Sequence, residues 1–206
     1  MVAAGTGTRF GAPKQFVTLR GAPVVHHAVA AASGACGGVV VVLPAAIEWE
    51  GPPVTAAVEG AETRSGSVRC GLAAVPDDAE IVVVHDAARP LAGAALFRAV
   101  VGAVEAGADG AVPALAVGDT VKRVEDDRVV ETVHRAGLVV VQTPQAFRAD
   151  VLRKAHAGGA EATDDAALVE AIGGDVRVVD GDPRNLKITT AMDLELVAAL
   201  LAGGEV

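Results

Sequence analysis

Hydrophobic residues along the chain gather in short, continuous runs of Val, Ile and Leu, separated by longer stretches of mixed polarity. Such runs are typical of strands that are buried on both faces of a sheet, because a strand with one solvated face alternates apolar and polar residues instead. We therefore predict strands over GVVVVL (38–43), IVVV (81–84), LVVVQ (138–142) and VRVV (176–179).

The stretches between these runs space their apolar residues three or four positions apart, which places them on one face of a helix. Alternation of helices with buried strands is typical of the α/β class, in which helices cover both faces of a parallel sheet. We predict a single-domain α/β fold over residues 1–206, with a mostly parallel, doubly wound sheet. The helices are expected at 22–33, 67–75, 94–106, 164–172 and 191–202.

The segment 117–133 breaks this alternation. Its sequence, VGDTVKRVEDDRVVETV, is charged and has short alternating stretches around Glu125, Asp126 and Asp127. This pattern predicts a β-hairpin that leaves the sheet. Two interpretations remain open at this point, namely a solvated excursion and a β-arm at 114–137 that holds a second subunit.

Composition limits both the core and the partners of the protein. Hydrophobic residues make up 51% of the chain and aromatic residues only 2%, so Val, Leu and Ala must build the core. The net charge of −9 argues against nucleic acid or an anionic membrane as a partner, because both bind to a broad basic surface. An anionic ligand would have to be held by a local basic cluster.

The cysteines and the absence of long apolar runs bear on location. Cys36 and Cys70 lie far apart without metal-ligand spacing, which indicates free thiols in a reducing compartment. No run approaches the roughly 20 apolar residues of a membrane helix, and no apolar stretch of signal-peptide length opens the chain. We expect a cytoplasmic protein with no membrane partner.

The opening stretch, MVAAGTGTRFGAPKQF, is a candidate anion-binding loop. Gly5 and Gly7 would let backbone N–H groups approach an anion, while Arg9 and Lys14 would supply positive charge. The stretch matches neither a P-loop nor the full dinucleotide fingerprint, so an ordinary turn is the alternative.

A carboxylate follows the predicted strand in IVVVHDAARP. In open α/β sheets ligands bind beyond the carboxyl ends of the strands, so Asp86 could hold a Mg²⁺ ion that bridges phosphates. The alternative is that Asp86 caps a helix and pairs with Arg89. We interpret His85 as structural, because no nearby residue pairs with it as a base.

Further polar clusters lie at VEGAETRSGSVRCGL and GDPRNLKITTAMDLELV. In the first, Ser65 or Ser67 is expected to begin a helix whose N–H groups and hydroxyls suit a polar ligand, although ordinary capping also explains Ser67. In the second, Lys187 lies in a strand-like stretch where partial burial implies a partner anion, and Thr189 or Thr190 is expected to cap the last helix. Together the clusters predict a polyphosphate and magnesium site.

Motifs that span nearly the whole chain carry a family resemblance. They are AAGTGTRFGAPKQF, EGAETRSGSVRCGL, VHDAARP, GDTVKR, TVHRAGL, QTPQAF, ATDDAALVE and GDPRNLKITT. In this order they resemble the 2-C-methyl-D-erythritol 4-phosphate cytidylyltransferase family of the non-mevalonate isoprenoid pathway. The resemblance implies a nucleotide-diphospho-sugar transferase-like fold. It also implies Mg²⁺-dependent transfer of a cytidylyl group from CTP to methylerythritol phosphate, with release of pyrophosphate.

The resemblance also implies roles for individual residues. Arg9 and Lys14 would hold the triphosphate and stabilise the pentavalent phosphorus. Lys187 would neutralise the α-phosphate from the far side, and Asp86 would bind the metal ion. The residues implied for nucleotide binding are Ala3, Ala4, Gly5, Gly7, Ala61, Glu62, Ser67 and Ala87. Those implied for the acceptor substrate are Asp86, Arg89, Thr120, Arg135 and Thr163.

The predicted hairpin gains a role from the same resemblance. In similar enzymes it is a β-arm that reaches across a homodimer, so Thr120 and Arg135 would contact the acceptor bound by the partner subunit. Thr163 would lie near the acceptor, and it could also cap the helix expected to begin at Asp164.

The chain departs from the family pattern at its start, since only Met1 and Val2 precede the AAG motif. We expect the central strand to be missing or cut short, which would leave ladder groups unpaired at a cost of roughly 1 to 3 kcal/mol each. Two smaller departures concern how the base and the triphosphate are bound. Ala61 stands where the family usually has a second glycine, and the loop at Ala12 is short.

Other functions remain as alternatives. A ribitol 5-phosphate or other polyol-phosphate cytidylyltransferase shares the loop and the HDA motif, but the run from Arg64 to Leu72 and the DAARP form favour methylerythritol phosphate. A non-catalytic module is a further alternative. The retained charges weigh against it, namely those of Arg9, Lys14, Asp86 and Lys187. A nicotinamide-dependent oxidoreductase is disfavoured because the glycine motif lacks its third glycine.

Overall fold

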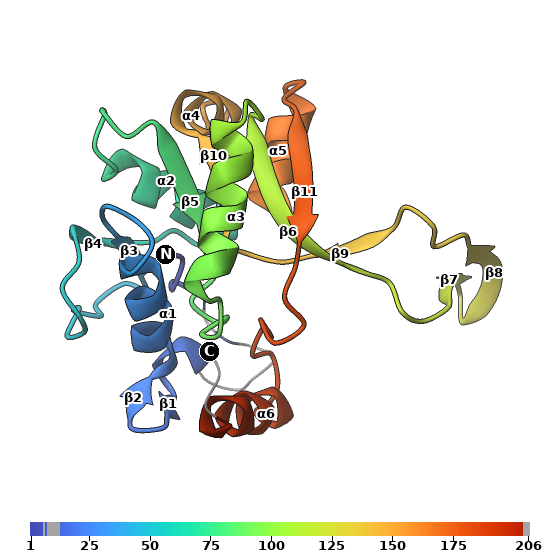
Figure 1. Cartoon of the computed structure of the whole chain (residues 1–206), viewed down its shortest axis with the longest axis horizontal. Coiled ribbons are helices and arrows are strands. Elements are labelled where there is room, and N and C mark those ends of the chain that lie inside the picture. Colours follow the sequence, from blue (N-terminus) through green and yellow to red (C-terminus); the bar gives the residue numbers. More distant parts are fainter. Residues whose placement is uncertain (6, 8–12, 204–206) are drawn as a thin grey trace.

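The computed structural model describes residues 1–5, 7 and 13–203, and shows a sheet with helices on both faces and a hairpin that projects to one side (Figure 1). The helices are α1 (Val24–Ser33), α2 (Arg64–Ala73), α3 (Ala94–Glu105), α4 (Ala149–His156), α5 (Asp165–Ala171) and α6 (Ala191–Ala202), with a 3-10 turn η1 (Lys14–Phe16). The strands are β1 (Thr18–Leu19), β2 (Ala22–Pro23), β3 (Val40–Leu43), β4 (Ala56–Glu59), β5 (Ile81–Val84), β6 (Gly110–Ala116), β7 (Val121–Glu125), β8 (Arg128–Val133), β9 (Val139–Val141), β10 (Gln145–Arg148) and β11 (Val176–Asp180).

The main sheet has one continuous part and one smaller part. The continuous part has the strand order β11-β6-β10-β5, in which β11 runs parallel to β6 and β10 runs antiparallel to both of its neighbours. The smaller part is the parallel pair β3 and β4.

Residues 1–3 join these two parts. Val2 forms parallel bridges to Val42 of β3 and to Asp86, just after β5. The amino group of Met1 donates to the Val40 carbonyl oxygen at 2.8 Å, and the Val2 N–H donates to the His85 carbonyl oxygen at 2.8 Å. The central position of the sheet is therefore occupied, but within the described residues it holds these residues alone.

A cavity of about 500 Å³ lies beside this short central segment, between β3 and β5. Its walls include Val40 and Val83 from the two strands, Leu72 from α2 and Phe97 from α3. The expected shortening of the central strand thus appears as an apolar cavity inside the sheet region.

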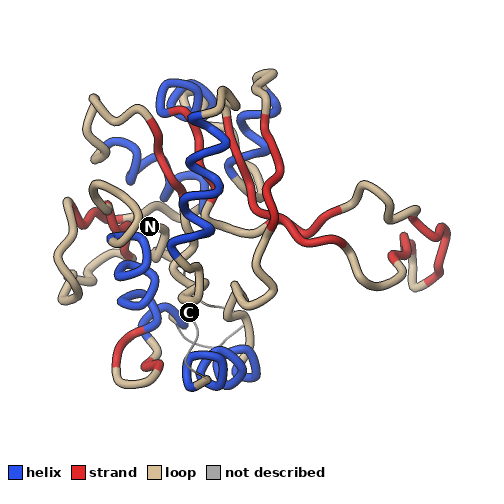
Figure 2. Tube along the Cα trace, in the orientation of Figure 1, coloured by secondary structure: helices blue, strands red, loops and turns tan. Residues whose placement is uncertain are grey.

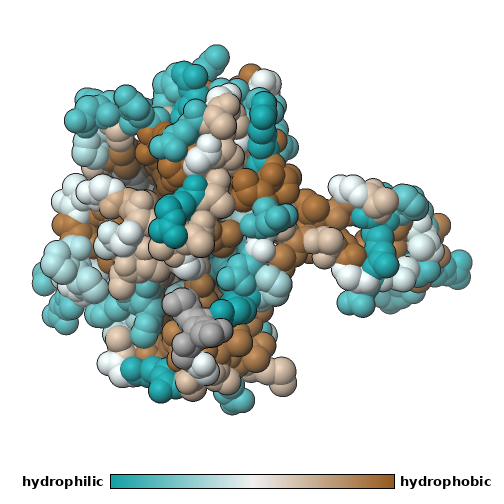
Figure 3. Space-filling view, viewed as in Figure 1, coloured by the Kyte–Doolittle hydropathy of each residue, from teal (hydrophilic) through white to brown (hydrophobic). Residues whose placement is uncertain are grey.

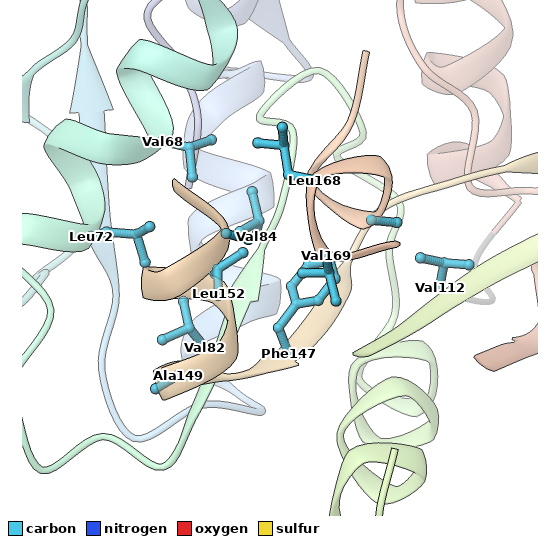
Figure 4. Packing of buried hydrophobic residues seen from close by; sticks show 12 residues of the cluster. Val68, Leu72, Val82, Val84, Val112, Phe147, Ala149, Leu152, Leu168 and Val169 are labelled. Atoms are coloured by element: carbon cyan, nitrogen blue, oxygen red, sulfur yellow. The ribbon is translucent and has the colours of Figure 1, made fainter. Parts of the chain in front are cut away.

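Small apolar side chains build the core on both faces of the sheet, as the composition predicts. On one face, α2, α4 and α5 pack against β5 and β10, with Leu152 and Phe147 fully buried (Figure 4). On the other face, α1 and α3 contribute Val29 and Phe97 to a cluster with β3. These layers hold the strand ends at a fixed position relative to the loops that follow them.

Two of the predicted strands differ from expectation in burial. Val178 of β11 is 59% exposed because β11 is an edge strand that pairs with β6. Val140 of β9 is 56% exposed because β9 pairs antiparallel with the end of β6, where the chain leaves the sheet. Continuous apolar runs therefore did not indicate burial on both faces in these two cases.

Helix prediction was accurate at some ends and wrong at others. The last helix has its predicted bounds, Ala191–Ala202, and Thr190 caps it in a capping box with Asp193. The helix α2 begins at Arg64 rather than Ser67, because Thr63 is its N-cap and accepts from the Gly66 N–H at 2.9 Å.

The predicted hairpin is present. Strands β7 and β8 pair antiparallel and stand away from the main sheet (Figure 2). Asp126 and Asp127 form the turn with φ values of 45° and 63°, a left-handed conformation that suits a two-residue hairpin turn.

Cys36 and Cys70 are free thiols, as the sequence predicts. Among the described helices, none has the length and apolar character needed to cross a membrane.

Candidate active site

A pocket of about 370 Å³ lies where residues 1–3 leave the sheet. It is formed by the opening loop, the loop between β4 and α2, the end of β5, and the segment before α6. Its lining residues are Val2, Ala3, Ala4, Gly5, Gly7, Lys14, Gln15, Ala61, Glu62, Thr63, Arg64, Ser67, Asp86, Ala87, Ala88 and Lys187. The structure thus brings together most residues that the sequence singled out.

A buried amide fastens the opening loop. The Nε2 group of Gln15 donates to the carbonyl oxygens of Ala3 and Gly5, each at 2.7 Å. Gly7 has a φ of 69°, a conformation that glycine adopts without steric cost. Lys14, next to Gln15 in η1, therefore lines the pocket from a fixed turn, while Arg9 lies outside the described residues.

Ser67 lies in the first turns of α2 and organises the loop before it. Its hydroxyl accepts from the Ala61 N–H at 3.1 Å and donates to the Thr63 carbonyl oxygen at 2.9 Å. A Cβ at Gly60 would lie 2.4 Å from the Cβ of Ala4 and 2.9 Å from the Ser67 hydroxyl oxygen. Only glycine at this position lets the two loops approach each other at the pocket.

Asp86 is held by two cations. Its Oδ2 lies 2.6 Å from Lys187 Nζ, and its Oδ1 lies 3.5 Å from Arg64 Nη2. Burial raises the pKa of Asp86, but the positive charges of Lys187 and Arg64 outweigh burial and keep that pKa below its usual range. Asp86 is therefore an ionised carboxylate at the carboxyl end of β5, and the proposed helix cap with Arg89 as its partner is wrong.

The sequence predicted that Lys187 has an anionic partner, and the structure shows that this partner is Asp86. The segment around Lys187 is a loop rather than the predicted strand. The next residue, Ile188, is fully buried, and its N–H donates to the Ala88 carbonyl oxygen at 2.8 Å. This anchor fixes the backbone of Lys187 beside Asp86, so its ammonium group reaches the pocket from the C-terminal part of the chain.

His85 has the structural role that the sequence predicts. Its ring Nε2–H donates to the Arg89 carbonyl oxygen at 3.1 Å, and its Nδ1 accepts from the Thr143 hydroxyl at 3.0 Å. The same hydroxyl oxygen accepts from the Asp86 N–H at 3.0 Å. Burial lowers the pKa of His85 to about 4, so a neutral imidazole orients the backbone that carries Asp86.

Some predicted site residues do not line the pocket in the described part of the chain. Arg89 donates from Nη1 to the Asn185 carbonyl oxygen at 2.7 Å. Thr120 and Arg135 lie in the projecting arm, where Arg135 donates to the carbonyl oxygens of Val117 and Gly118.

Thr163 also lies outside the pocket lining. It is exposed and does not cap α5. The N-cap is Asp164, whose Oδ1 accepts from the Ala167 N–H at 3.0 Å. The helix therefore begins at Asp165, one residue later than predicted, and Asp164 rather than Thr163 is its N-cap.

The sequence did not reveal the role of Arg64. Its Nη1 lies 2.9 Å from Oδ2 of Asp165, a fully buried carboxylate that also contacts His156. Burial lowers the pKa of Arg64, but the nearby Asp86 and Asp165 outweigh burial and raise it. No local pattern could have indicated this contact, because Asp165 lies far along the chain.

A glycine-containing loop, lysines and a strand-end carboxylate around one pocket are the features expected of an α/β protein with a site for a polyphosphate. A sequence model of the family described as 2-C-methyl-D-erythritol 4-phosphate cytidylyltransferase matches residues 1–203. The chain therefore belongs to this family, and its enzyme class is nucleotidyltransferase.

Individual relatives agree with this assignment. The protein of that name from Nocardia farcinica is 48% identical over 212 residues, which cover 97% of this chain and 91% of the relative. Its counterpart from Saccharopolyspora erythraea is 47% identical over 216 residues, covering 97% and 96%. The crystal structure of the Thermus thermophilus enzyme matches with a TM-score of 0.84 and 36% identity, covering 98% of this chain and 97% of that one. The family resemblance and the fold class predicted from the sequence are confirmed.

Proposed function

We propose that this chain transfers a cytidylyl group from CTP to 2-C-methyl-D-erythritol 4-phosphate and releases pyrophosphate. The observation that carries the proposal is the meeting of Lys14, Asp86 and Lys187 beside the glycine-containing loop, in a chain of this family. These residues come from distant parts of the sequence, and they form one charged pocket at the end of the central strands.

The reaction asks mainly for positioning and charge neutralisation. A phosphate oxygen of the acceptor attacks the α-phosphorus of CTP, the bond to the β-phosphate oxygen breaks, and pyrophosphate leaves with its electron pair. The attacking oxygen is already anionic, so no strong base is required. Arg9 and Lys14 would hold the triphosphate, and Lys187 would neutralise charge that develops at the α-phosphate.

The contact between Lys187 and Asp86 supports this role for the lysine. The side chain of Lys187 is 38% exposed, so its ammonium can exchange the carboxylate for a ligand phosphate without leaving a deeply buried site. Lysine suits such an exchange because it is a point charge on a flexible stem.

Asp86 fits a metal ion that is shared with phosphates. Among the described residues no group of three or more acidic, His or Cys side chains gathers, so phosphate oxygens and water would supply the other ligands. We propose Mg²⁺ as the cofactor, held by Asp86, where it would neutralise charge on the triphosphate.

The small residues around the pocket suit a nucleotide. The backbone of Ala3, Ala4, Ala61 and Glu62, with the Ser67 hydroxyl, would contact the cytosine edge, because small side chains expose backbone donors and acceptors. Gly5 and Gly7 would approach the phosphates, and Ala87 would contact the ribose.

We further propose that the arm at 114–137 holds a second copy of the chain, and that residues 1–206 otherwise form one nucleotidyltransferase domain. Val124, Val129 and Val130 on the arm are 55%, 61% and 51% exposed. Hydrophobic surface also covers the point where the arm leaves the sheet (Figure 3). A solvated hairpin has no need of this apolar surface, which favours a protein partner.

The dimer would give the remaining predicted residues a function. Thr120 and Arg135, which lie far from the pocket of their own chain, would contact the acceptor in the pocket of the partner subunit. Arg89 and Thr163 would contribute near the acceptor from the same chain as the pocket. The free cysteines support the cytoplasm as the place of action.

The experiment that tests the function follows pyrophosphate release from labelled CTP and Mg²⁺ with either methylerythritol phosphate or ribitol 5-phosphate. We expect release with methylerythritol phosphate. Release with ribitol 5-phosphate alone would show that ribitol 5-phosphate is the acceptor substrate. Release with neither acceptor would refute the proposed cytidylyltransferase activity. Lys187→Ala should abolish most turnover, whereas Lys154→Ala, at an exposed position on α4, should retain it.

A further inference from the structure

A series of charged side chains leads from the pocket into the core. Lys187 pairs with Asp86 at 2.6 Å, and Asp86 faces Arg64 at 3.5 Å. Arg64 in turn pairs with Asp165 at 2.9 Å, and His156 Nε2–H donates to the other oxygen of Asp165 at 3.0 Å. Arg64 is thus both a pocket residue and one half of a buried ion pair.

The two cations that face Asp86 are anchored differently. Lys187 has a flexible side chain, and Asp86 is the carboxylate with which it pairs in the described structure. Arg64 faces a second carboxylate, Asp165, whose side chain is 0% exposed. Withdrawal of Arg64 would leave that buried charge uncompensated, so Arg64 is the cation that stays when the two compete for a ligand.

We propose that Arg64 is a positioning residue that keeps the Asp86 carboxylate in place while the phosphates of a bound nucleotide draw Lys187 away. This proposal rests on the proposed function, because the triphosphate is the anion that competes for Lys187. Arginine suits the task since its planar guanidinium holds two nitrogens in fixed positions, so Nη2 faces Asp86 while Nη1 lies against Asp165. The three N–H groups of a lysine ammonium share one nitrogen and cannot be divided in this way.

Asp165 and His156 would act through Arg64. The hydrogen bond from His156 engages Oδ1 of Asp165 and leaves Oδ2 for Arg64. The side chains of Asp165 and His156 are nearly fully buried, so packing holds the Asp165 carboxylate in place. That carboxylate in turn holds the guanidinium group of Arg64. The orientation of Asp86 in the pocket is therefore set from the core formed by α4 and α5.

The first test compares Arg64→Gln with Arg69→Gln in the same helix, where Arg69 pairs with Glu161 on the surface at 2.6 Å. We expect Arg64→Gln to lower kcat about tenfold to a hundredfold, the loss typical of a misplaced group, with KM for CTP changed less than about threefold. Arg69→Gln should leave both constants unchanged. A change in KM alone, or equal effects in the two variants, would overturn the proposal.

Arg64→Lys provides a variant that retains the positive charge beside Asp165. Because lysine cannot face both carboxylates with a fork, we expect it to fold and still to lose kcat by a similar factor. Full activity in Arg64→Lys would show that charge suffices, and would contradict a positioning role.

A second readout needs no activity. Urea unfolding of Arg64→Gln, Asp86→Asn and the double variant measures whether the two side chains are coupled in the free protein. We expect the double variant to lower the urea midpoint by less than the sum of the single shifts, whereas additive shifts would overturn the contact. If the unsubstituted chain releases no pyrophosphate, the proposed function fails, and this cycle still tests the coupling of Arg64 to Asp86.

Discussion

The sheet consists of two groups of strands, one on each side of residues 1–3, and these two groups are held together in different ways. On one side, β5, β10, β6 and β11 form a continuous ladder with a closely packed helical layer. On the other side, β3 and β4 reach the rest of the sheet through Met1, Val2 and Ala3 within the described residues. The same short segment leads into the charged pocket. Residues 1–3, which we call the joint, therefore connect the two parts of the sheet, and two of them, Val2 and Ala3, also line the candidate site.

Two cavities adjoin the short segment that joins the two parts of the sheet. The larger cavity, about 500 Å³, lies between β3 and β5 and is mainly apolar. The smaller one, about 370 Å³, has Lys14, Asp86 and Lys187 in its wall. Among the described residues that line the larger cavity none is a lysine or an arginine, so side-chain charge rather than size identifies the candidate site for a phosphate ligand.

The largest expected effect comes from one substitution made at two leucines of the same core cluster. Leu152 packs on the continuous side, whereas Leu72 also borders the larger cavity. We expect Leu152→Ala to lower the free energy of unfolding by about 4 kcal/mol and Leu72→Ala by about 2 to 3 kcal/mol, since Leu72 has fewer contacts to lose. Urea denaturation measures both free energies of unfolding. Equal losses in the two variants would contradict looser packing around Leu72, beside the larger cavity.

The next effect is a pH dependence at the joint itself. Burial lowers the pKa of His85 from 6.5 to about 4, so the unfolded chain binds the proton more readily than the folded one. Stability from neutral His85 is complete above pH 6.5 and is lost as the pH falls toward 4, by about 3 kcal/mol.

Urea midpoints between pH 6 and 4 measure most of this loss, because the buried Met1 amino group, whose pKa is lowered to about 6, takes up its proton mainly above that range. His85→Gln should flatten the slope over that range, although it lowers stability at neutral pH. A slope that persists in His85→Gln would assign the dependence to another group.

A smaller effect is expected from filling the larger cavity. Four residues, Val-Val-Val-Ala, placed before Met1 would extend the central segment between β3 and β5. They would also replace the buried amino group, whose pKa burial lowers to about 6, by an uncharged amide that can still donate to Val40. Burial of three valines contributes about 4.5 to 9 kcal/mol and ordering of four residues costs about 4 to 8 kcal/mol, which leaves a net gain of about 1 kcal/mol.

The matched control carries Gly-Ser-Gly-Ser at the same place. It adds equal length without apolar side chains, so its free energy of unfolding should stay close to that of the unextended chain. Equal stabilities of the two extended variants would show that the cavity does not accept a strand.

The smallest effect is expected in the arm. Asp127 has a φ of 63°, which glycine adopts more readily than aspartate. We expect Asp127→Gly to stabilise the hairpin by about 0.5 kcal/mol, seen as slower hydrogen exchange of the β7 and β8 amides, with no change in the global urea midpoint. Asp119→Gly, outside the turn, should not slow this exchange.

The sequence predicted those parts of the fold that have a local cause. The apolar spacing and the Thr190 cap define α6, and β-branched runs define β3 and β5. The strands β4 (AAVE), β6 (GAVPALA) and β10 (QAFR) were not predicted, because none of them is a continuous run of β-branched residues. Their pairing depends on neighbours that are distant in the sequence.

The candidate site was predicted to a similar extent. Residues that follow strands, such as Asp86, and residues in a glycine-containing loop, such as Lys14, could be identified from position and chemistry. The contact of Arg64 with Asp165 had no such signal, because it depends on how α2 packs against α5. Long-range packing therefore determines how the site is held, while local sequence determines which groups it contains.

A crystal structure of the chain with CTP and Mg²⁺ tests the proposed nucleotide site most directly. We expect the triphosphate between Lys14 and Lys187, the metal at Asp86, and the cytosine against Ala61 and Ser67. A nucleotide bound in the larger cavity between β3 and β5, or elsewhere on the surface, would contradict the account.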